Sequence, residues 1–201
     1  MSTLPTTSET NPNAGFLMVA GMAGVAWAIA IGMLLLSQID QIRDPLAPLR
    51  VLFYLVALAA GVLTFLPLEL RLRIPGLAFE GTIGGFLLLY TLAFVPAPTE
   101  SLLSPPDAPV YLLFAAALFW FVSAAALPAA AAIGQRLFRE RARQYDLRRA
   151  SRQAREVAAA CAICVILAGL RVLTPLGALL VVLIVVVAEL AVLSFMKTAD
   201  R

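Results

Sequence analysis

Long apolar segments are the feature of this sequence that most limits its fold. A helix that crosses a bilayer needs about 20 predominantly apolar residues, and six segments reach or approach that length. Since lipid offers no partners to backbone N–H and C=O groups, such segments must be helical. The chain is therefore predicted to be all-α, a polytopic transmembrane helical bundle of about six spans. The expected spans are residues 15–37, 48–68, 74–95, 109–134, 157–173 and 175–196.

The composition supports a single membrane domain. Hydrophobic residues make up 62% of the chain and charged residues only 13%, whereas about a quarter of a soluble domain is charged. No segment between the spans is long enough to build a core of its own. We expect a disordered cytosolic tail at 1–14 and one transmembrane domain at 15–201. Between the last two spans, Thr174 and Pro175 predict an N-cap followed by proline at the first helical position, and so a very short turn.

The stretch from 136 to 156 contains eight of the fifteen Lys and Arg residues. Basic residues in short loops stay in the cytosol, so this loop is predicted to be cytosolic. Both termini then lie in the cytosol, and the acidic, proline-rich loop at 96–109 lies outside. The predicted localisation is the cell membrane. The eight residues are Arg136, Arg139, Arg141, Arg143, Arg148, Arg149, Arg152 and Arg155.

Small and apolar residues recur every three or four positions on both sides of the arginine-rich loop, which is typical of helices. We therefore expect the fourth and fifth spans to continue into the cytosol as an antiparallel hairpin at 135–156, turning near Tyr145. Its arginines are interpreted as contacts for anionic lipid headgroups or for an acidic partner subunit. No nucleic-acid partner is expected, because no aromatic platform accompanies the bases. The two stripes are Ala131, Gly134, Phe138, Ala142 and Tyr145, and Leu147, Ala150, Ala154, Val157 and Cys161.

Two carboxylates interrupt the predicted spans, and an ionisable group inside a bilayer indicates a candidate functional site. Glu80 and Glu189 are expected at similar depth in the cytosolic third, where Arg71, Arg73 or Lys197 could neutralise them. One interpretation is a protonatable pair in an ion or proton pathway, with pKa values raised by burial. The other is an interhelical hydrogen bond or ion pair that fixes packing.

Cys161 and Cys164 are the only cysteines of the chain. A C-x-x-C pair lowers the pKa of one thiol in redox proteins, which makes a membrane thiol redox site one interpretation. Cysteine is also a small apolar residue suited to a helix interface.

Small residues crowd two of the predicted spans. Such residues let transmembrane helices approach closely, and they are expected either to pack the bundle internally or to bind a second membrane protein. They are Gly15, Ala20, Gly21, Ala23, Gly24, Ala26, Ala28, Ala30 and Gly32 in the first span, and Gly81, Gly84 and Gly85 in the third.

The chain contains no histidine, which excludes histidine-based metal sites and Ser-His or Cys-His catalysis. No cofactor, metal or enzymatic activity is expected. The function expected first is a non-catalytic integral subunit or scaffold of a larger membrane complex. The alternatives are a small transporter or channel component that uses its intramembrane carboxylates, and a membrane thiol redox protein.

Overall fold

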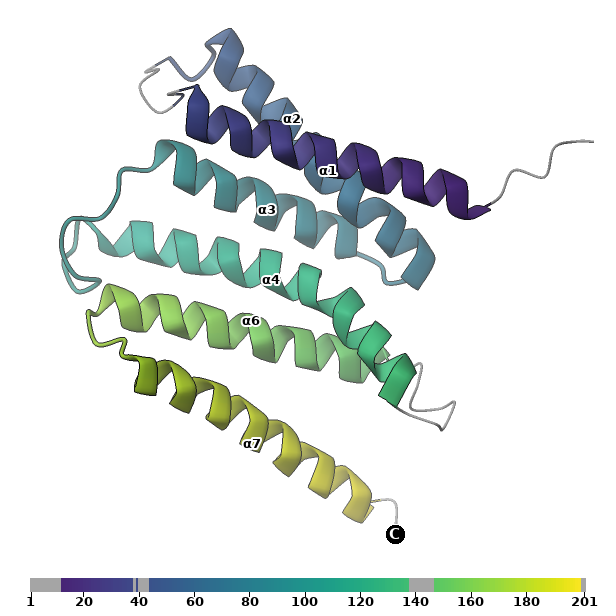
Figure 1. The fold of residues 1–201 in the computed structure, drawn as a ribbon. Coiled ribbons are helices and arrows are strands. Elements are labelled where there is room, and N and C mark those ends of the chain that lie inside the picture. Colours follow the sequence, from purple (N-terminus) through teal and green to yellow (C-terminus); the bar gives the residue numbers. More distant parts are fainter. Residues whose placement is uncertain (1–11, 38, 40–43, 138–146, 200–201) are drawn as a thin grey trace, which may run out of the picture.

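The computed structural model describes residues 12–37, 39, 44–137 and 147–199. This part of the chain is helical throughout its regular structure and contains no strand (Figure 1). The helices are α1 (Pro12–Leu36), α2 (Pro48–Leu72), α3 (Leu77–Phe94), α4 (Ala108–Leu137), α6 (Leu147–Gly169) and α7 (Pro175–Ala199).

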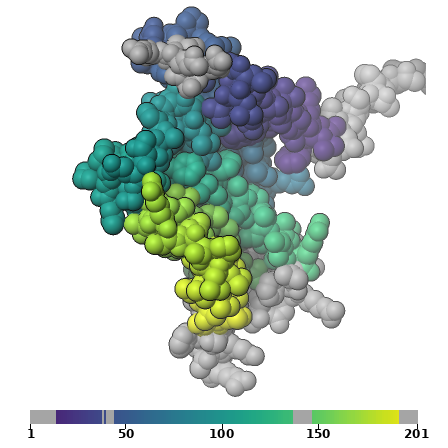
Figure 2. All heavy atoms as spheres, turned by 60° about the vertical axis from the view of Figure 1, so that its left-hand side comes forward, coloured from purple at the N-terminus to yellow at the C-terminus, as the bar shows by residue number. Residues whose placement is uncertain are grey.

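The six described helices form an open row in chain order. Each packs mainly on the helices before and after it, most closely at α4–α6 and least at α6–α7. Successive helices run in opposite directions, with α1 and α2 at one edge of the row and α7 at the other (Figure 1). In the space-filling view the colours pass in the same order across the molecule, and α7 lies forward at its lower edge (Figure 2).

Four of the helices are long and apolar enough to cross a membrane, so the chain has the build of a helical membrane protein. They correspond to α1, α2, α3 and α4. The polar first three turns of α6 keep it outside this group, and the described apolar part of α7, Pro175–Ala191, is shorter. The membrane crossings of α6 and α7 therefore stay a prediction.

Glycines allow the central helices to approach closely. A Cβ atom built on Gly84 of α3 would lie 2.5 Å from the backbone nitrogen of Phe121 in α4, and one on Gly61 would lie 2.9 Å from Cα of Thr82. The small residues of α3 thus pack the row internally. In α1, by contrast, a Cβ atom on Gly15, Gly21, Gly24 or Gly32 would meet nothing within 4 Å.

Alanines form the contact between α4 and α6. Ala150 and Ala154 of α6 are buried, as their periodicity predicts, and join Ala124 and Ala131 of α4 in one apolar cluster. The buried line then continues through Ala158. The predicted stripe does not hold at Leu147 and Val157, which are 38% and 47% exposed. A repeat of four keeps nearly the same face of a helix because one turn takes 3.6 residues.

The predicted hairpin turn falls outside the described residues, and so do Phe138, Ala142, Tyr145, Arg139, Arg141 and Arg143. What the structure describes on either side is helical. The last turn of α4 carries Arg136, and α6 begins at Leu147 and continues without interruption into its apolar half. The α2–α3 turn lies at the same ends of the helices, and we call this side of the molecule the arginine end.

The connections at the opposite end, which we call the acidic end, are held by hydrogen bonds. The Asp107 carboxylate accepts bonds from the backbone N–H groups of Thr99 (2.8 Å) and Glu100 (2.6 Å). Arg171 donates to the carbonyl oxygen of Thr99 at 3.0 Å, which ties this loop to the α6–α7 connection. Gly177 donates its N–H to the Thr174 hydroxyl at 3.0 Å, which confirms the N-cap predicted for α7.

Candidate functional site

The described ion pairs gather where the polar half of α6 faces α7. The Glu189 carboxylate accepts hydrogen bonds from Arg152 at both oxygens, from Nε at 3.1 Å and from the terminal guanidinium nitrogen at 2.9 Å. Gln153 adds a third bond at 3.0 Å from its amide nitrogen. Only 14% of the Glu189 side chain is exposed. The carboxylate is therefore held in bidentate geometry, the strong form of an arginine–carboxylate contact.

A second carboxylate lies beside this pair. Glu156, four residues after Arg152 on α6, lies 3.6 Å from the Arg152 guanidinium. Burial raises the pKa of the Glu156 carboxyl, and the negative charge of Glu189 raises it further, while Arg152 acts in the opposite direction. Glu156 precedes the apolar half of α6, which begins at Val157. One arginine thus serves two carboxylates, and Glu156 binds a proton more readily than an ordinary glutamate.

The structure does not bring together the two carboxylates singled out in the sequence. Glu80 is exposed in the first turn of α3, whereas Glu189 lies on α7, with α4 and α6 between them in the row. Nor do Arg71 and Arg73, two of the expected counter-ions, contact Glu189, whose described donors are Arg152 and Gln153. Arg71 lies over the ring of Phe16, 4.9 Å from its centre.

The other two expected counter-ions are Arg73 and Lys197. Arg73 caps the end of α2 with a left-handed backbone, at φ 55°. The side chain of Lys197 lies outside the described residues.

One carboxylate of structural importance was missed in the sequence. Glu69, near the end of α2, accepts a 2.6 Å hydrogen bond from the backbone N–H of Ala78 in the first turn of α3. Helix starts leave N–H groups without partners inside the helix, and Glu69 satisfies one of them across the α2–α3 turn. Its position nine residues before the donor is not a capping pattern, so the sequence carried no signal for it.

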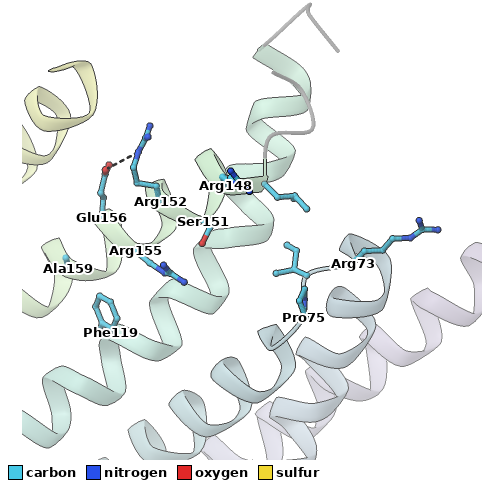
Figure 3. A pocket seen from close by; sticks show the side chains of 11 residues that line it. Arg73, Pro75, Phe119, Arg148, Ser151, Arg152, Arg155, Glu156 and Ala159 are labelled. Carbon is cyan, nitrogen blue, oxygen red and sulfur yellow. Dashed lines mark ion pairs between the residues drawn. The ribbon is translucent and has the colours of Figure 1, made fainter. Parts of the chain in front are cut away.

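An arginine-lined cleft of about 680 Å³ lies at the arginine end (Figure 3). It is bounded by the α2–α3 turn, by α4 and by the polar half of α6. Its lining combines four arginines with one carboxylate, one hydroxyl and several apolar side chains. The lining residues are Arg73, Ile74, Pro75, Phe119, Leu147, Arg148, Ser151, Arg152, Arg155, Glu156 and Ala159.

The cysteines lie in the apolar half of α6. Cys161 and Cys164 are both half-buried, and both are free thiols. Within the described residues, no three His, Cys, Asp or Glu side chains lie close enough together to hold a metal ion.

No protein-family model, curated protein or solved structure matches this chain. The function is therefore inferred from the geometry described above.

Proposed function

We propose that this chain is a non-catalytic integral subunit of a larger membrane assembly. In this proposal it has six spans in the cell membrane, and α1 binds a neighbouring transmembrane helix. The arginine end, with the hairpin at 135–156, is cytosolic and docks anionic lipid or an acidic partner.

The observation that carries the proposal is the direction of the small-residue face of α1. Ala23 and Ala30 are buried and Trp27 donates to Thr64 of α2 at 3.0 Å, so these residues mark the side of α1 that packs on α2. At 100° per residue, Gly21 and Gly32 fall on the opposite side of the helix.

The outward side of α1 has the features of a helix-binding face. Gly21 and Ala28 are exposed, and Cβ atoms on Gly21 and Gly32 would meet nothing within 4 Å. Small residues at such spacing drive association in membranes, where lipid provides no hydrophobic force between helices. Because α1 packs chiefly on α2 and its outward side is exposed, a second helix has access to this face.

The experiment compares particle sizes after mild solubilisation of native membranes. The wild-type chain is expected in a particle larger than one chain, and Ala28→Leu, which fills the outward side of α1, is expected to reduce it. Ala125→Leu places the same side chain at an exposed position of α4 and should leave the particle unchanged. A wild-type chain that runs as a folded monomer would refute the proposal.

The proposed orientation rests on the arginines of one end of the row. It predicts that a fluorescent protein fused after Arg201 folds in the cytosol, and that a periplasmic or extracytoplasmic reporter enzyme fused there stays inactive. The opposite pattern would reverse the orientation while leaving the packing argument for α1 intact. No transport function is proposed, because Glu80 and Glu189 belong to helices that are not neighbours.

A further inference from the structure

The cleft at the arginine end changes in character along its length. Along α6 its lining runs from Leu147 to Ala159, which is about 18 Å at 1.5 Å per residue. Arg148 lies at the start of α6 and belongs to the charged part. Ala159 of α6 and Phe119 of α4 form an apolar wall nearer the middle of these two helices (Figure 3). All four arginines of the lining lie between Ala159 and the helix ends, mixed with apolar residues of the α2–α3 turn, whereas its far part is apolar. This arrangement matches the amphipathic character of a lipid.

Arginines give the cleft an excess of positive charge. Arg155 and the hydroxyl of Ser151 point into the space between α6 and the α2–α3 turn, and Arg73 extends outward at the rim (Figure 3). Within the described part of the chain, Arg73 and Arg155 take part in no ion pair. Arg152 is engaged by Glu189 and Glu156, so the negative charge of those two carboxylates is directed at that side chain.

We propose that this cleft binds one anionic phospholipid, with its phosphate at Arg155 and Ser151 and an acyl chain along Phe119 and Ala159. Guanidinium groups match the geometry of phosphate oxygens and bind them through paired, charge-assisted hydrogen bonds. Arg148 adds positive charge at the start of α6, and Arg73 adds it at the rim of the cleft. The volume of about 680 Å³ lies within the range of small-molecule sites.

A membrane lipid is favoured over free phosphate because of the apolar wall. A soluble anion would gain nothing from Phe119 and Ala159, whereas an acyl chain buries apolar surface against them. The site deepens the lipid-docking part of the proposed function, and it does not depend on a partner at α1.

The test is native mass spectrometry of the full chain in mild detergent, titrated with phosphatidylglycerol or with phosphatidylcholine of the same acyl chains. The wild type is expected to retain one phosphatidylglycerol in preference to phosphatidylcholine. Arg155→Gln should weaken phosphatidylglycerol binding about fivefold, the effect of one basic residue near an anionic headgroup. Arg136→Gln removes the same charge at the same end of the row but outside the cleft, and should leave the affinity unchanged.

Two further variants test the cleft. Arg73→Gly should weaken binding, while glycine suits the left-handed backbone at this position. Arg171→Gly is its control, because Arg171 has the same backbone conformation, at φ 59°, in the α6–α7 connection at the acidic end. Glu156→Gln removes a negative charge from the lining and should strengthen binding, the opposite direction from the arginine variants.

Three outcomes would overturn the inference. Equal retention of the two lipids would show that no anionic headgroup is selected. An equal loss in Arg136→Gln and Arg155→Gln would show diffuse attraction rather than a cleft. Displacement of the lipid by millimolar inorganic phosphate would identify a soluble anion as the ligand. Each outcome leaves the particle size measured for α1 unaffected, so the two proposals fail separately.

Discussion

The substitution Arg152→Gln tests how strongly the contact between α6 and α7 stabilises the fold. The described part of α7 packs chiefly on α6, and its charged attachment is the bidentate pair between Arg152 and Glu189. The shorter, neutral glutamine removes both of these hydrogen bonds and the ion pair. The bond from Gln153 would remain, while the Glu189 side chain stays mostly buried.

The expected loss of stability lies between the losses found when surface and buried ion pairs are broken. An exposed pair contributes at most about 1 kcal/mol, whereas removing one partner of a fully buried pair costs about 3–5 kcal/mol. The side chains of Arg152 and Glu189 are 31% and 14% exposed, which places this pair between the two cases. We expect Arg152→Gln to lower the free energy of unfolding by about 2 kcal/mol. For a chain of this size that is a fall of about 4–8 °C in Tm.

The assay is thermal unfolding in mild detergent, followed by far-ultraviolet circular dichroism. Arg155→Gln, three residues farther along α6, makes the same substitution outside any described ion pair and should cost less than about 0.5 kcal/mol. Glu189→Gln combined with Arg152→Gln completes a double-mutant cycle, with an expected coupling of about 1–2 kcal/mol. Equal losses for Arg152→Gln and Arg155→Gln, or purely additive effects, would refute the assignment.

Three further predictions concern Gly84, Asp107 and Glu156. Gly84→Ala should lower the free energy of unfolding by about 1–3 kcal/mol, because its Cβ would overlap the backbone of Phe121; Gly24→Ala, with open space around it, should not destabilise. Asp107→Ala should speed proteolytic cleavage of the loop that the carboxylate holds, and unchanged cleavage would contradict its role. The pKa of Glu156 is raised in the folded state, so its contribution favours the fold at low pH and is lost as the pH rises through its titration. Glu156→Gln should therefore raise Tm at neutral pH, and a lower Tm would show that its contact with Arg152 outweighs the burial of its charge.

Features that depend on local chemistry were predictable from the sequence. The length and apolarity of residues 15–37 predict a helix wherever lipid surrounds them, and α1 covers most of that segment. The N-cap at Thr174 follows from a hydroxyl placed directly before a helix that begins with proline. The stripe through Ala150 and Ala154 follows from the helical repeat. In each case the residues that decide the feature are close together in the chain.

The tertiary structure alone decided which distant groups meet. Arg152 and Glu189 are 37 residues apart, and their contact depends on the rotation of α6 and α7 about their axes. The sequence placed Glu189 with Glu80 because it gave their depth but could not say that two helices separate them. It also marked the small residues of α1 and α3 alike, although those of α3 are enclosed by neighbouring helices and the outward glycines of α1 are not. Depth and helicity are properties of a segment, whereas the partner of a side chain depends on the neighbour and rotation of its helix.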